Sequence, residues 1–271
     1  MEKLIQTISD NVPAEGDTYT GQDGLLHCSR CGGARQTRIT VPMIGERVVG
    51  VMCPCMRAAH DAEEERSRRS EIEIARSRCF AESNMHSWTF DNSAGYDPEI
   101  EKAMKNYVKH YDEFKRQGKG LLLYGPVGTG KSYMAACIAN ALIDEGYRVL
   151  MTNFSTLTNR IQGMWEGKQE YIDSLNRYSL LIIDDLGAER GTEYMQEQVF
   201  NIVDARYRSG RPMIITTNLT KNELVKPDDI GNSRIYDRIL ERCHPVEISG
   251  GSKRRQKIRD THSETKALLG L

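Results

Sequence analysis

The stretch that decides the fold is GPVGTGKS, Gly125 to Ser132. An apolar run, Leu121 to Tyr124, precedes it, and an amphipathic helical pattern through Ile143 follows it. Glycines at these positions let the backbone curl, so that successive N–H groups and the positive end of the next helix face a phosphate chain. In this pattern the lysine reaches the β- and γ-phosphates, and the serine hydroxyl ligates Mg²⁺. The predicted nucleotide contacts are Gly125, Pro126, Val127, Gly128, Thr129, Gly130, Lys131, Ser132 and Tyr133.

A second apolar run, Leu180 to Ile183, ends in two carboxylates, Asp184 and Asp185. A phosphate-loop enzyme needs an acid at the end of a neighbouring strand to hold Mg²⁺, and we assign that role to Asp184. Asp185 is predicted to orient or deprotonate the attacking water; the alternative is a charge that faces solvent or a helix N-terminus. Glu189 is a weaker alternative for the base.

A third run, Met213 to Thr217, ends in Asn218. If this strand neighbours both the strand before the phosphate loop and the strand before Asp184, the Asn218 amide lies beside the γ-phosphate. Taken alone, an asparagine after a strand is more often a turn former.

Short apolar runs alternate with helical patterns from about residue 95 onward. This alternation predicts an α/β fold with a five-stranded parallel sheet between helices. The predicted strands are Leu121 to Tyr124, Val149 to Thr152, Leu180 to Ile183, Met213 to Thr217 and Val246 to Ile248. A helix is expected from Pro98 to Gly118 with Asp97 as its N-cap, and an extra helical pair is expected over 155–177.

Two close cysteine pairs lie near the N-terminus, Cys28 with Cys31 and Cys53 with Cys55. Two such pairs can close a tetrahedral Zn²⁺ site, and because all four ligands are thiols we predict a structural metal. The alternatives are buried reduced cysteines, a redox pair, or a site in which His27 or His60 replaces one thiol.

The length and composition of the chain exclude some classes of protein. The chain has 271 residues with a net charge of −1, which excludes a globally basic nucleic-acid binder. No apolar run approaches the length of about 20 residues that a membrane span needs, and the N-terminus lacks the pattern of a signal peptide, so we expect a cytoplasmic protein. We predict an N-terminal zinc-binding module over residues 1–60, a charged helical linker over 61–94 and an ATPase domain over 95–271.

With these motifs in this order, residues 95–271 resemble an AAA+ ATPase of the DnaC/DnaI/IstB group, which contains helicase loaders and transposition helper ATPases. The matching segments are GPVGTGKS (125–132), LLIIDDLGAE (180–189), NIVDARY (201–207), IITTN (214–218), SRIYDR (233–238) and GGSKR (250–254). The chain departs from the family where Asp185 replaces a common glutamate and where Lys253 replaces a common aromatic residue.

The resemblance implies an ATPase whose neighbouring subunits complete each other's sites. It assigns Arg238 as an arginine finger that reaches the γ-phosphate of the next subunit, and Arg254 as a second sensor in the same subunit. Arg234, four residues before Arg238 on the same helical face, is a candidate to share the task. From the residues alone, each of these arginines is better explained as a surface ion-pair partner, and only its place in the motif favours the functional role.

The resemblance also implies partners. A helicase loader delivers the replicative DnaB-type helicase, binds single-stranded DNA and assembles into a ring or spiral. Basic and aromatic residues in 155–177, among them Trp165, suit a single strand, although ordinary packing explains the aromatic residues equally well. The basic stretch 253–259 is a second candidate for DNA contact. The alternatives are an IstB-like transposition helper ATPase and a nucleotide-gated adaptor with negligible hydrolysis.

Overall fold

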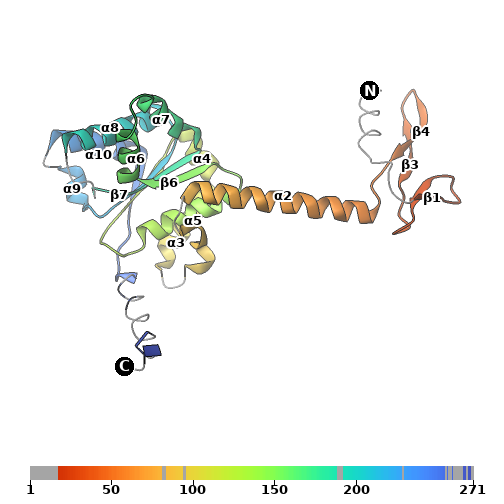
Figure 1. The fold of residues 1–271 in the computed structure, drawn as a ribbon, viewed down its shortest axis with the longest axis horizontal. Helices are drawn as coiled ribbons and strands as arrows, with labels where there is room; N and C mark the ends of the chain where they lie inside the picture. Colours follow the sequence, from red (N-terminus) through yellow and green to blue (C-terminus); the bar gives the residue numbers. More distant parts are fainter. Residues whose placement is uncertain are drawn as a thin grey trace. The chain divides into compact units, whose positions relative to one another are not determined.

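The computed structural model describes residues 18–80, 84–93, 96–187, 192–227 and 229–253, and in addition 255, 258, 265–266 and 268–269. The chain divides into two compact units, Met1–Glu71 and Ile72–Leu271. The division falls inside the long helix α2 (Pro54–Phe80), shown in orange in Figure 1. The boundaries predicted from the sequence at 60/61 and 94/95 stay predictions.

The second unit is built on a five-stranded sheet with the order β6-β7-β8-β5-β9, in which every neighbouring pair is parallel. The strands are β5 (Gly120–Tyr124), β6 (Val149–Asn153), β7 (Leu180–Leu186), β8 (Met213–Thr217) and β9 (Cys243–Glu247). The predicted fold class is thereby confirmed. β8 lies between β7 and β5, which is the arrangement that the role of Asn218 requires.

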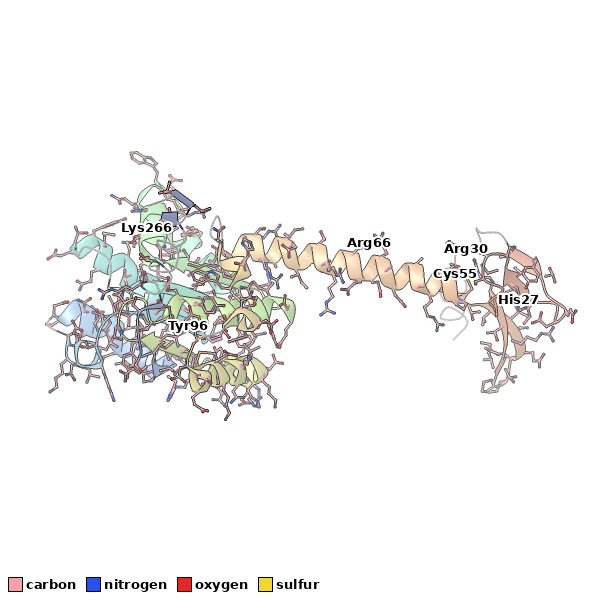
Figure 2. All side chains as sticks on the ribbon, turned by 90° about the horizontal axis from the view of Figure 1, so that it is seen from below. His27, Arg30, Cys55, Arg66, Tyr96 and Lys266 are labelled. Carbon is pink, nitrogen blue, oxygen red and sulfur yellow. The ribbon has the colours of Figure 1, made fainter. Side chains whose placement is uncertain are left out.

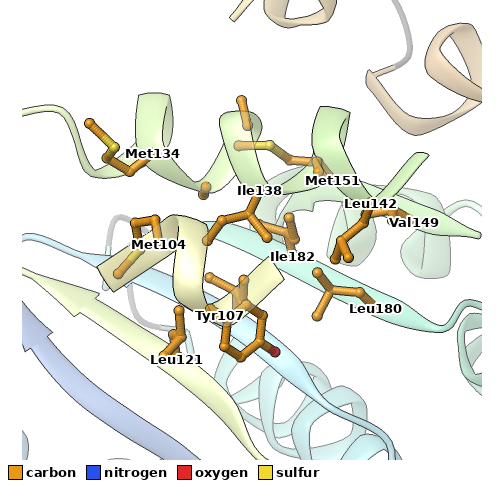
Figure 3. Close-up of a cluster of buried hydrophobic side chains, with 14 of the residues drawn as sticks. Met104, Tyr107, Leu121, Met134, Ile138, Leu142, Val149, Met151, Leu180 and Ile182 are labelled. Carbon is orange, nitrogen blue, oxygen red and sulfur yellow. The ribbon is translucent and has the colours of Figure 1, made fainter. Parts of the chain in front are cut away.

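Helices cover both faces of this sheet because its strand residues alternate between two apolar clusters. Leu121, Leu180 and Ile182 pack beneath α3 and α5 on one face (Figure 3). Leu122 and Ile183 point to the other face and pack against α6, α8 and α10. The helices of this unit are α3 (Pro98–Lys109), α4 (Tyr111–Gln117), α5 (Lys131–Asp144), α6 (Phe154–Gln162), α7 (Lys168–Ser174), α8 (Glu193–Arg208), α9 (Lys221–Val225) and α10 (Ile230–Arg242), with short 3-10 turns at Asn84–Ser87, Phe90–Asn92 and Leu175–Arg177.

Two predicted elements differ from the structure. The helix expected from Pro98 to Gly118 is broken at His110, which ends α3 and precedes α4. The predicted N-cap is confirmed, because the Asp97 side chain accepts a hydrogen bond from the Glu99 amide at 2.9 Å. The last strand runs from Cys243 to Glu247 rather than from Val246 to Ile248. As an edge strand that pairs only with β5, it tolerates polar residues and Pro245, which hid it from a search for apolar runs.

A buried arginine fastens α8 to the sheet. The Arg206 side chain is 0% exposed, and its guanidinium donates to the carbonyl oxygens of Leu175, Tyr178, Ser179 and Pro212 at 2.7 to 3.4 Å. Burial lowers the pKa of Arg206 to about 10. Four carbonyl oxygens thus satisfy the donors of a charge that usually needs an acid partner when it is buried.

The described part of the first unit contains two antiparallel strand pairs and the start of α2. The pairs join β1 (Thr18–Thr20) to β2 (Leu26–Cys28), and β3 (Gln36–Val41) to β4 (Gly45–Gly50). Among the residues of this unit that the structure describes, the buried side chains are Cys28, Arg35, Val41, Val49 and Cys53. Because this described core is small, we expect a metal cross-link to contribute to the stability of the unit.

The charged helix α2 is solvated over most of its length, as predicted. Ion pairs along it include Arg69 with Glu65 at 2.8 Å and Arg66 with Glu63 at 3.2 Å. Within the second unit, its last turn is buried through Cys79 and Phe80. Among the residues that the structure describes, no helix combines the length and the apolar character that crossing a bilayer requires.

Candidate functional site: a phosphate loop with an acid pair, and a cysteine cluster

The loop from Gly125 to Gly130 joins β5 to α5 in a conformation that its glycines permit. Gly125 and Gly130 have φ angles of 139° and 109°, which side-chain-bearing residues rarely adopt. A Cβ atom on Gly125 would lie 2.4 Å from the Ile248 carbonyl oxygen, and one on Gly130 would lie 2.2 Å from the Tyr96 ring. At these two positions the loop therefore has room for backbone only, as a phosphate cradle requires.

Lys131 is the first residue of α5 and folds back over this loop. Its side chain is 5% exposed, and its ammonium group donates to the carbonyl oxygens of Gly125 at 2.9 Å and Pro126 at 2.8 Å. The first amides of α5 have no acceptor within the helix, so they point along its axis toward the loop. An anion held there meets both the ammonium and these amides.

The segment after β9 anchors the loop from the other side. The Ile248 amide donates to the Tyr124 carbonyl oxygen at 2.8 Å, and the Lys253 amide donates to the Gly128 carbonyl oxygen at 2.9 Å. The Thr129 hydroxyl donates to the Pro126 carbonyl oxygen at 3.0 Å. Lys253, in the segment after β9, is thus held at the phosphate loop. Arg254, the predicted second sensor, lies outside the described residues, as does Glu189.

A cavity of about 300 Å³ opens beside the loop. It is lined by Tyr96, Asp97, Ile100, Thr129, Met134, Ile248, Ser249, Gly250, Gly251 and Lys253. Tyr96, labelled in Figure 2, stacks on Tyr133 with ring centroids 4.5 Å apart, and the Lys253 ammonium lies 5.7 Å from the Tyr96 ring centroid. The Tyr133 side chain is therefore a packing group, which leaves its backbone amide as its predicted contact with a nucleotide. Sequence reasoning missed Tyr96, which precedes the motif by almost thirty positions.

Asp184 lies where a magnesium ligand is expected. Its carboxylate accepts a hydrogen bond from the Thr216 hydroxyl at 2.5 Å, and the Ser132 hydroxyl is near enough to lower the pKa of this carboxyl group. Burial raises the pKa of Asp184 above its ordinary value, and both hydroxyls and the Lys131 ammonium oppose that rise. A carboxylate beside a hydroxyl is the oxygen-donor set that Mg²⁺ prefers, so Ser132 and Asp184 fit the ion that the sequence predicts.

Asp185 and Asn218 are also brought together. The Asn218 amide nitrogen lies 3.4 Å from Asp185 Oδ1. The Asp185 carboxylate is exposed, and its backbone has a φ of 58°, in the left-handed region. The pairing of β7 with β8 shifts register between Ile183 and Leu186, so this acid leaves the sheet at an irregularity. A bulge of this kind re-aims a side chain next to a site.

Arg238 lies on α10 and packs against α8. Its Nε donates to Asp204 Oδ1 at 2.7 Å, and its guanidinium lies 4.6 Å from the Phe200 ring centroid. Arg234 lies over the same ring, also at 4.6 Å, so both candidates for the finger share one face of α10. These contacts hold Arg238 in place on its own chain. They leave its predicted role toward a neighbouring copy as a prediction.

The second candidate site is the cysteine cluster of the first unit, near Cys55 in Figure 2. The sulfur atoms of Cys28, Cys31, Cys53 and Cys55 all lie within 4.8 Å of one another. The Cys55 sulfur is 3.4 Å from that of Cys53 and 3.6 Å from that of Cys28. These separations are too long for a disulfide and close to the ~3.8 Å between thiolates that share a tetrahedral zinc ion.

Backbone amides prepare two of these sulfurs for a cation. The amides of Cys31 and Arg30 lower the pKa of Cys28, and the amides of Cys55 and Gly33 lower the pKa of Cys31 to about 6. Hydrogen bonds to its neighbours' sulfurs, that of Cys53 first, raise the pKa of Cys55 to about 12. Four crowded sulfurs of which two favour the thiolate form fit a divalent cation, which removes their mutual repulsion.

The histidine alternatives fit less well. The His27 ring nitrogens face the Asp23 carboxylate at 3.1 Å and the Gly32 carbonyl oxygen at 3.3 Å. These contacts stabilise the turn that carries Cys28 and Cys31. His60 lies 3.8 Å from Glu64 on the exposed surface of α2. The four cysteines therefore remain the predicted zinc ligands.

Removing the metal is expected to unfold the first unit. Purified chain should carry about one zinc ion, and a chelator or Cys28→Ser should release it. Loss of the metal should also remove the protection of the strand amides of residues 18–50 from hydrogen exchange, because the described part of the unit has little other core. Metal analysis and amide hydrogen exchange measure both effects. Cys243→Ala, which removes a buried thiol of the second unit, is the control and should keep the zinc. A chain without zinc whose first unit is fully protected from exchange contradicts the assignment.

Comparisons with known proteins agree with this geometry. Residues 56–261 match the family described as IstB-like ATP binding protein. An insertion-sequence ATP-binding protein of Sinorhizobium fredii is 31% identical over 203 residues, which cover 73% of this chain and 66% of that protein. The replicative helicase loader DnaI of Bacillus subtilis is 26% identical over 161 residues, 55% of this chain and 51% of the loader.

Among solved structures, a crystal structure of DnaI matches with a TM-score of 0.54 and 25% identity, over 66% of this chain and 98% of that one. The chain spans about half to two thirds of the length of these two curated relatives. The family match covers the helix that follows the cysteine cluster, the phosphate loop and the acid pair. The chain belongs to the IstB-like ATP-binding family of AAA+ proteins, in which insertion-sequence ATP-binding proteins and DnaI- and DnaC-type helicase loaders are its relatives.

Proposed function

We propose that this chain is an ATP-hydrolysing helicase loader that binds single-stranded DNA and delivers a DnaB-type replicative helicase. The observation that carries the ATPase part is the meeting of Lys131, Ser132 and Asp184 at the ends of β5 and β7. The loader part is supported by the relatives DnaI and DnaC and by the cysteine unit that precedes the ATPase unit.

Each residue of the site has a task in hydrolysis. Lys131 and the loop amides bind the phosphates, and Ser132 and Asp184 hold Mg²⁺, which when bound neutralises charge on the phosphate oxygens. Asn218 orients the attacking water. Asp185 accepts a proton from this water as the water oxygen forms a bond to the γ-phosphorus. The bond from that phosphorus to the bridging oxygen breaks, and ADP leaves with the electron pair. Arg238 of a neighbouring copy stabilises the charge of the transferred group.

The test of the loader role is co-purification with a candidate replicative helicase, with and without ATP. A loader is expected to retain the helicase through its cysteine unit, so Cys28→Ser should lose the complex while keeping ATP binding. Retention of a transposase instead of the helicase would favour the second candidate below.

A transposition helper ATPase is the second candidate, because the insertion-sequence ATP-binding protein of Sinorhizobium fredii matches the longest stretch of this chain among the relatives named here. Such a helper binds duplex DNA and recruits a transposase. Preference for duplex over single-stranded DNA in a competition experiment would select this function. A third possibility is an adaptor with negligible hydrolysis. A measured release of phosphate that depends on Arg238 would exclude it.

Trp165 is the residue expected to stack on a DNA base. It lies between α6 and α7 with its side chain 100% exposed, so the packing alternative does not hold for it. Nearby, the Arg160 guanidinium lies 5.0 Å from the Tyr171 ring centroid, which places a cation beside a partly buried aromatic ring. This segment therefore offers the positive charge of Arg160 for phosphates and the exposed ring of Trp165 for a base.

Trp165→Ala is expected to weaken binding of a thymidine oligonucleotide about tenfold, since one stacked base contributes about 1–3 kcal/mol. Fluorescence anisotropy measures the affinity, and in a Trp88→Phe background quenching of Trp165 reports the contact directly. Ile230→Ala, which also removes an exposed apolar side chain, is the matched control. Undiminished affinity with an unquenched Trp165 would move the DNA site to the basic stretch 253–259.

A further inference from the structure

One buried hydroxyl connects the two acids of the site. Thr216 lies at the end of β8, between β7 and β5, and is 0% exposed. Its hydroxyl donates to Asp184 Oδ1 at 2.5 Å and accepts a hydrogen bond from the Asp185 amide at 2.9 Å. A threonine hydroxyl has one proton to donate, so its direction is fixed by the carboxylate on one side and the amide on the other.

The Asp185 backbone needs such a support. The left-handed φ of 58° costs a residue with a side chain about 1–3 kcal/mol and persists only where surrounding contacts over-determine it. The register shift between Ile183 and Leu186 takes residues 184–185 out of the regular ladder with β8. The Asp185 amide donates to the Thr216 side chain instead, which closes the irregularity with a hydrogen bond.

The same geometry accounts for the acid found at position 185. Asp and Asn enter the left-handed region several-fold more readily than other residues that carry a side chain, and a glutamate has no such tolerance. The departure from the Asp-Glu pair common in AAA+ proteins therefore accompanies a bulged strand end. The shorter side chain is placed by the turned backbone, next to Asn218.

We propose that Thr216 is a positioning residue that sets both acids at once, orienting the Asp184 carboxylate toward the cation and holding the Asp185 backbone in its turned conformation. The proposal rests on the proposed ATPase function. It predicts that loss of this one hydroxyl changes cation binding and turnover together, whereas nucleotide binding without the cation, which uses Lys131 and the loop amides, stays intact.

The neighbouring threonine provides a matched control. Thr217 is also 0% exposed and lies on the same strand. Its hydroxyl donates to the Leu186 carbonyl oxygen at 2.7 Å and accepts a hydrogen bond from the Leu219 amide at 3.1 Å. Thr217→Ala thus removes a hydroxyl with the same burial and the same number of bonds, but without a contact to either acid.

The experiment compares full-length wild type, Thr216→Ala, Thr216→Ser and Thr217→Ala. Affinity for a fluorescent ATP analogue is measured in EDTA and across a Mg²⁺ titration, and kcat and KM for ATP are measured in parallel. Thr216→Ala is expected to raise the Mg²⁺ concentration for half-maximal tightening at least about fivefold and to lower kcat at least about tenfold. Its affinity in EDTA should stay within about twofold of wild type, and Thr216→Ser should restore both quantities. Thr216→Val, which fills the same volume, replaces alanine if the cavity prevents folding.

Two results would overturn the proposal. One is a Thr216→Ala or Thr216→Val chain with wild-type Mg²⁺ dependence. The other is an equal Mg²⁺ shift in Thr217→Ala, which would assign the effect to the strand end as a whole. Lys131→Ala and Asp184→Asn keep this failure separate from a failure of the ATPase assignment: if both retain hydrolysis, the proposed function is wrong, and if both lose it, only the role of Thr216 is at stake.

Discussion

Replacing Lys131 by alanine is expected to lower the affinity for ATP at least about 100-fold. A hydrogen bond to a charged group contributes about 1.5–3 kcal/mol, and the predicted lysine reaches two phosphates. About 3 kcal/mol corresponds to a factor of more than 100 in the dissociation constant. In the structure the same ammonium bridges the carbonyl oxygens of Gly125 and Pro126, so alanine also removes a contact that stabilises the loop.

A second lysine, Lys119, provides a control for the loss of a lysine that donates to backbone carbonyl oxygens. Lys119 donates from its ammonium to the Glu241 carbonyl oxygen at 2.7 Å, at the opposite end of β5 from the phosphate loop. Lys119→Ala therefore removes the same kind of contact away from the phosphate loop and should bind ATP normally. Titration calorimetry measures both variants, and an unchanged ATP affinity in Lys131→Ala refutes the phosphate-loop assignment.

Much of the fold could be predicted because its strands are buried on both faces. The three inner strands β7, β8 and β5 and the apolar edge strand β6 follow runs such as Leu180 to Ile183, whose residues alternate between the two apolar clusters. The other edge strand, β9, was misplaced because its sequence CHPVE is mostly polar and exposed and contains a proline. The break at His110 has no glycine or proline signal in the sequence, and tertiary packing of α3 and α4 decides it.

The parts of the site that follow a strand end could also be predicted. Parallel strands deliver their carboxyl ends to one edge, so Ser132, Asp184 and Asn218 were expected to meet once β8 lay between β5 and β7. Contacts that depend on side-chain direction could not be predicted. Nothing in the sequence distinguishes Thr216 from the other residues of its strand, and no sequence pattern predicts the left-handed backbone of Asp185.

Arg206 illustrates the same limit on a larger scale. Its place in NIVDARY indicates a family segment, but an arginine in an amphipathic helix ordinarily faces solvent. The structure buries it completely because carbonyl oxygens before β7 and β8 converge on one point. Convergence of backbone from two separate segments is a tertiary property, so no spacing rule detects it.

Replacing Arg238 by alanine is expected to leave ATP affinity within about twofold of wild type and to lower hydrolysis about 10³-fold, the lower end for loss of an arginine finger. On its own chain, the Arg238 guanidinium donates to Asp204 and stacks on Phe200, contacts that hold it against α8. Arg242→Ala, one turn further along α10 and stacked on Tyr207 at 4.8 Å, is the control and should keep wild-type turnover. Equal rates in wild type and Arg238→Ala would remove the finger role.

Mixing two inactive variants shows whether Arg238 acts on the neighbouring copy or within its own chain. A Lys131→Ala subunit has an intact finger, and an Arg238→Ala subunit has an intact phosphate loop. In a head-to-tail assembly mixed at equal amounts, about one quarter of the interfaces join an intact loop to an intact finger, so hydrolysis should return to about that fraction. A finger that acts within its own chain cannot be complemented, and the mixture would then stay inactive. Because Asp204 and Phe200 hold Arg238 on α8 rather than at Lys131, the recovery of activity is the expected result.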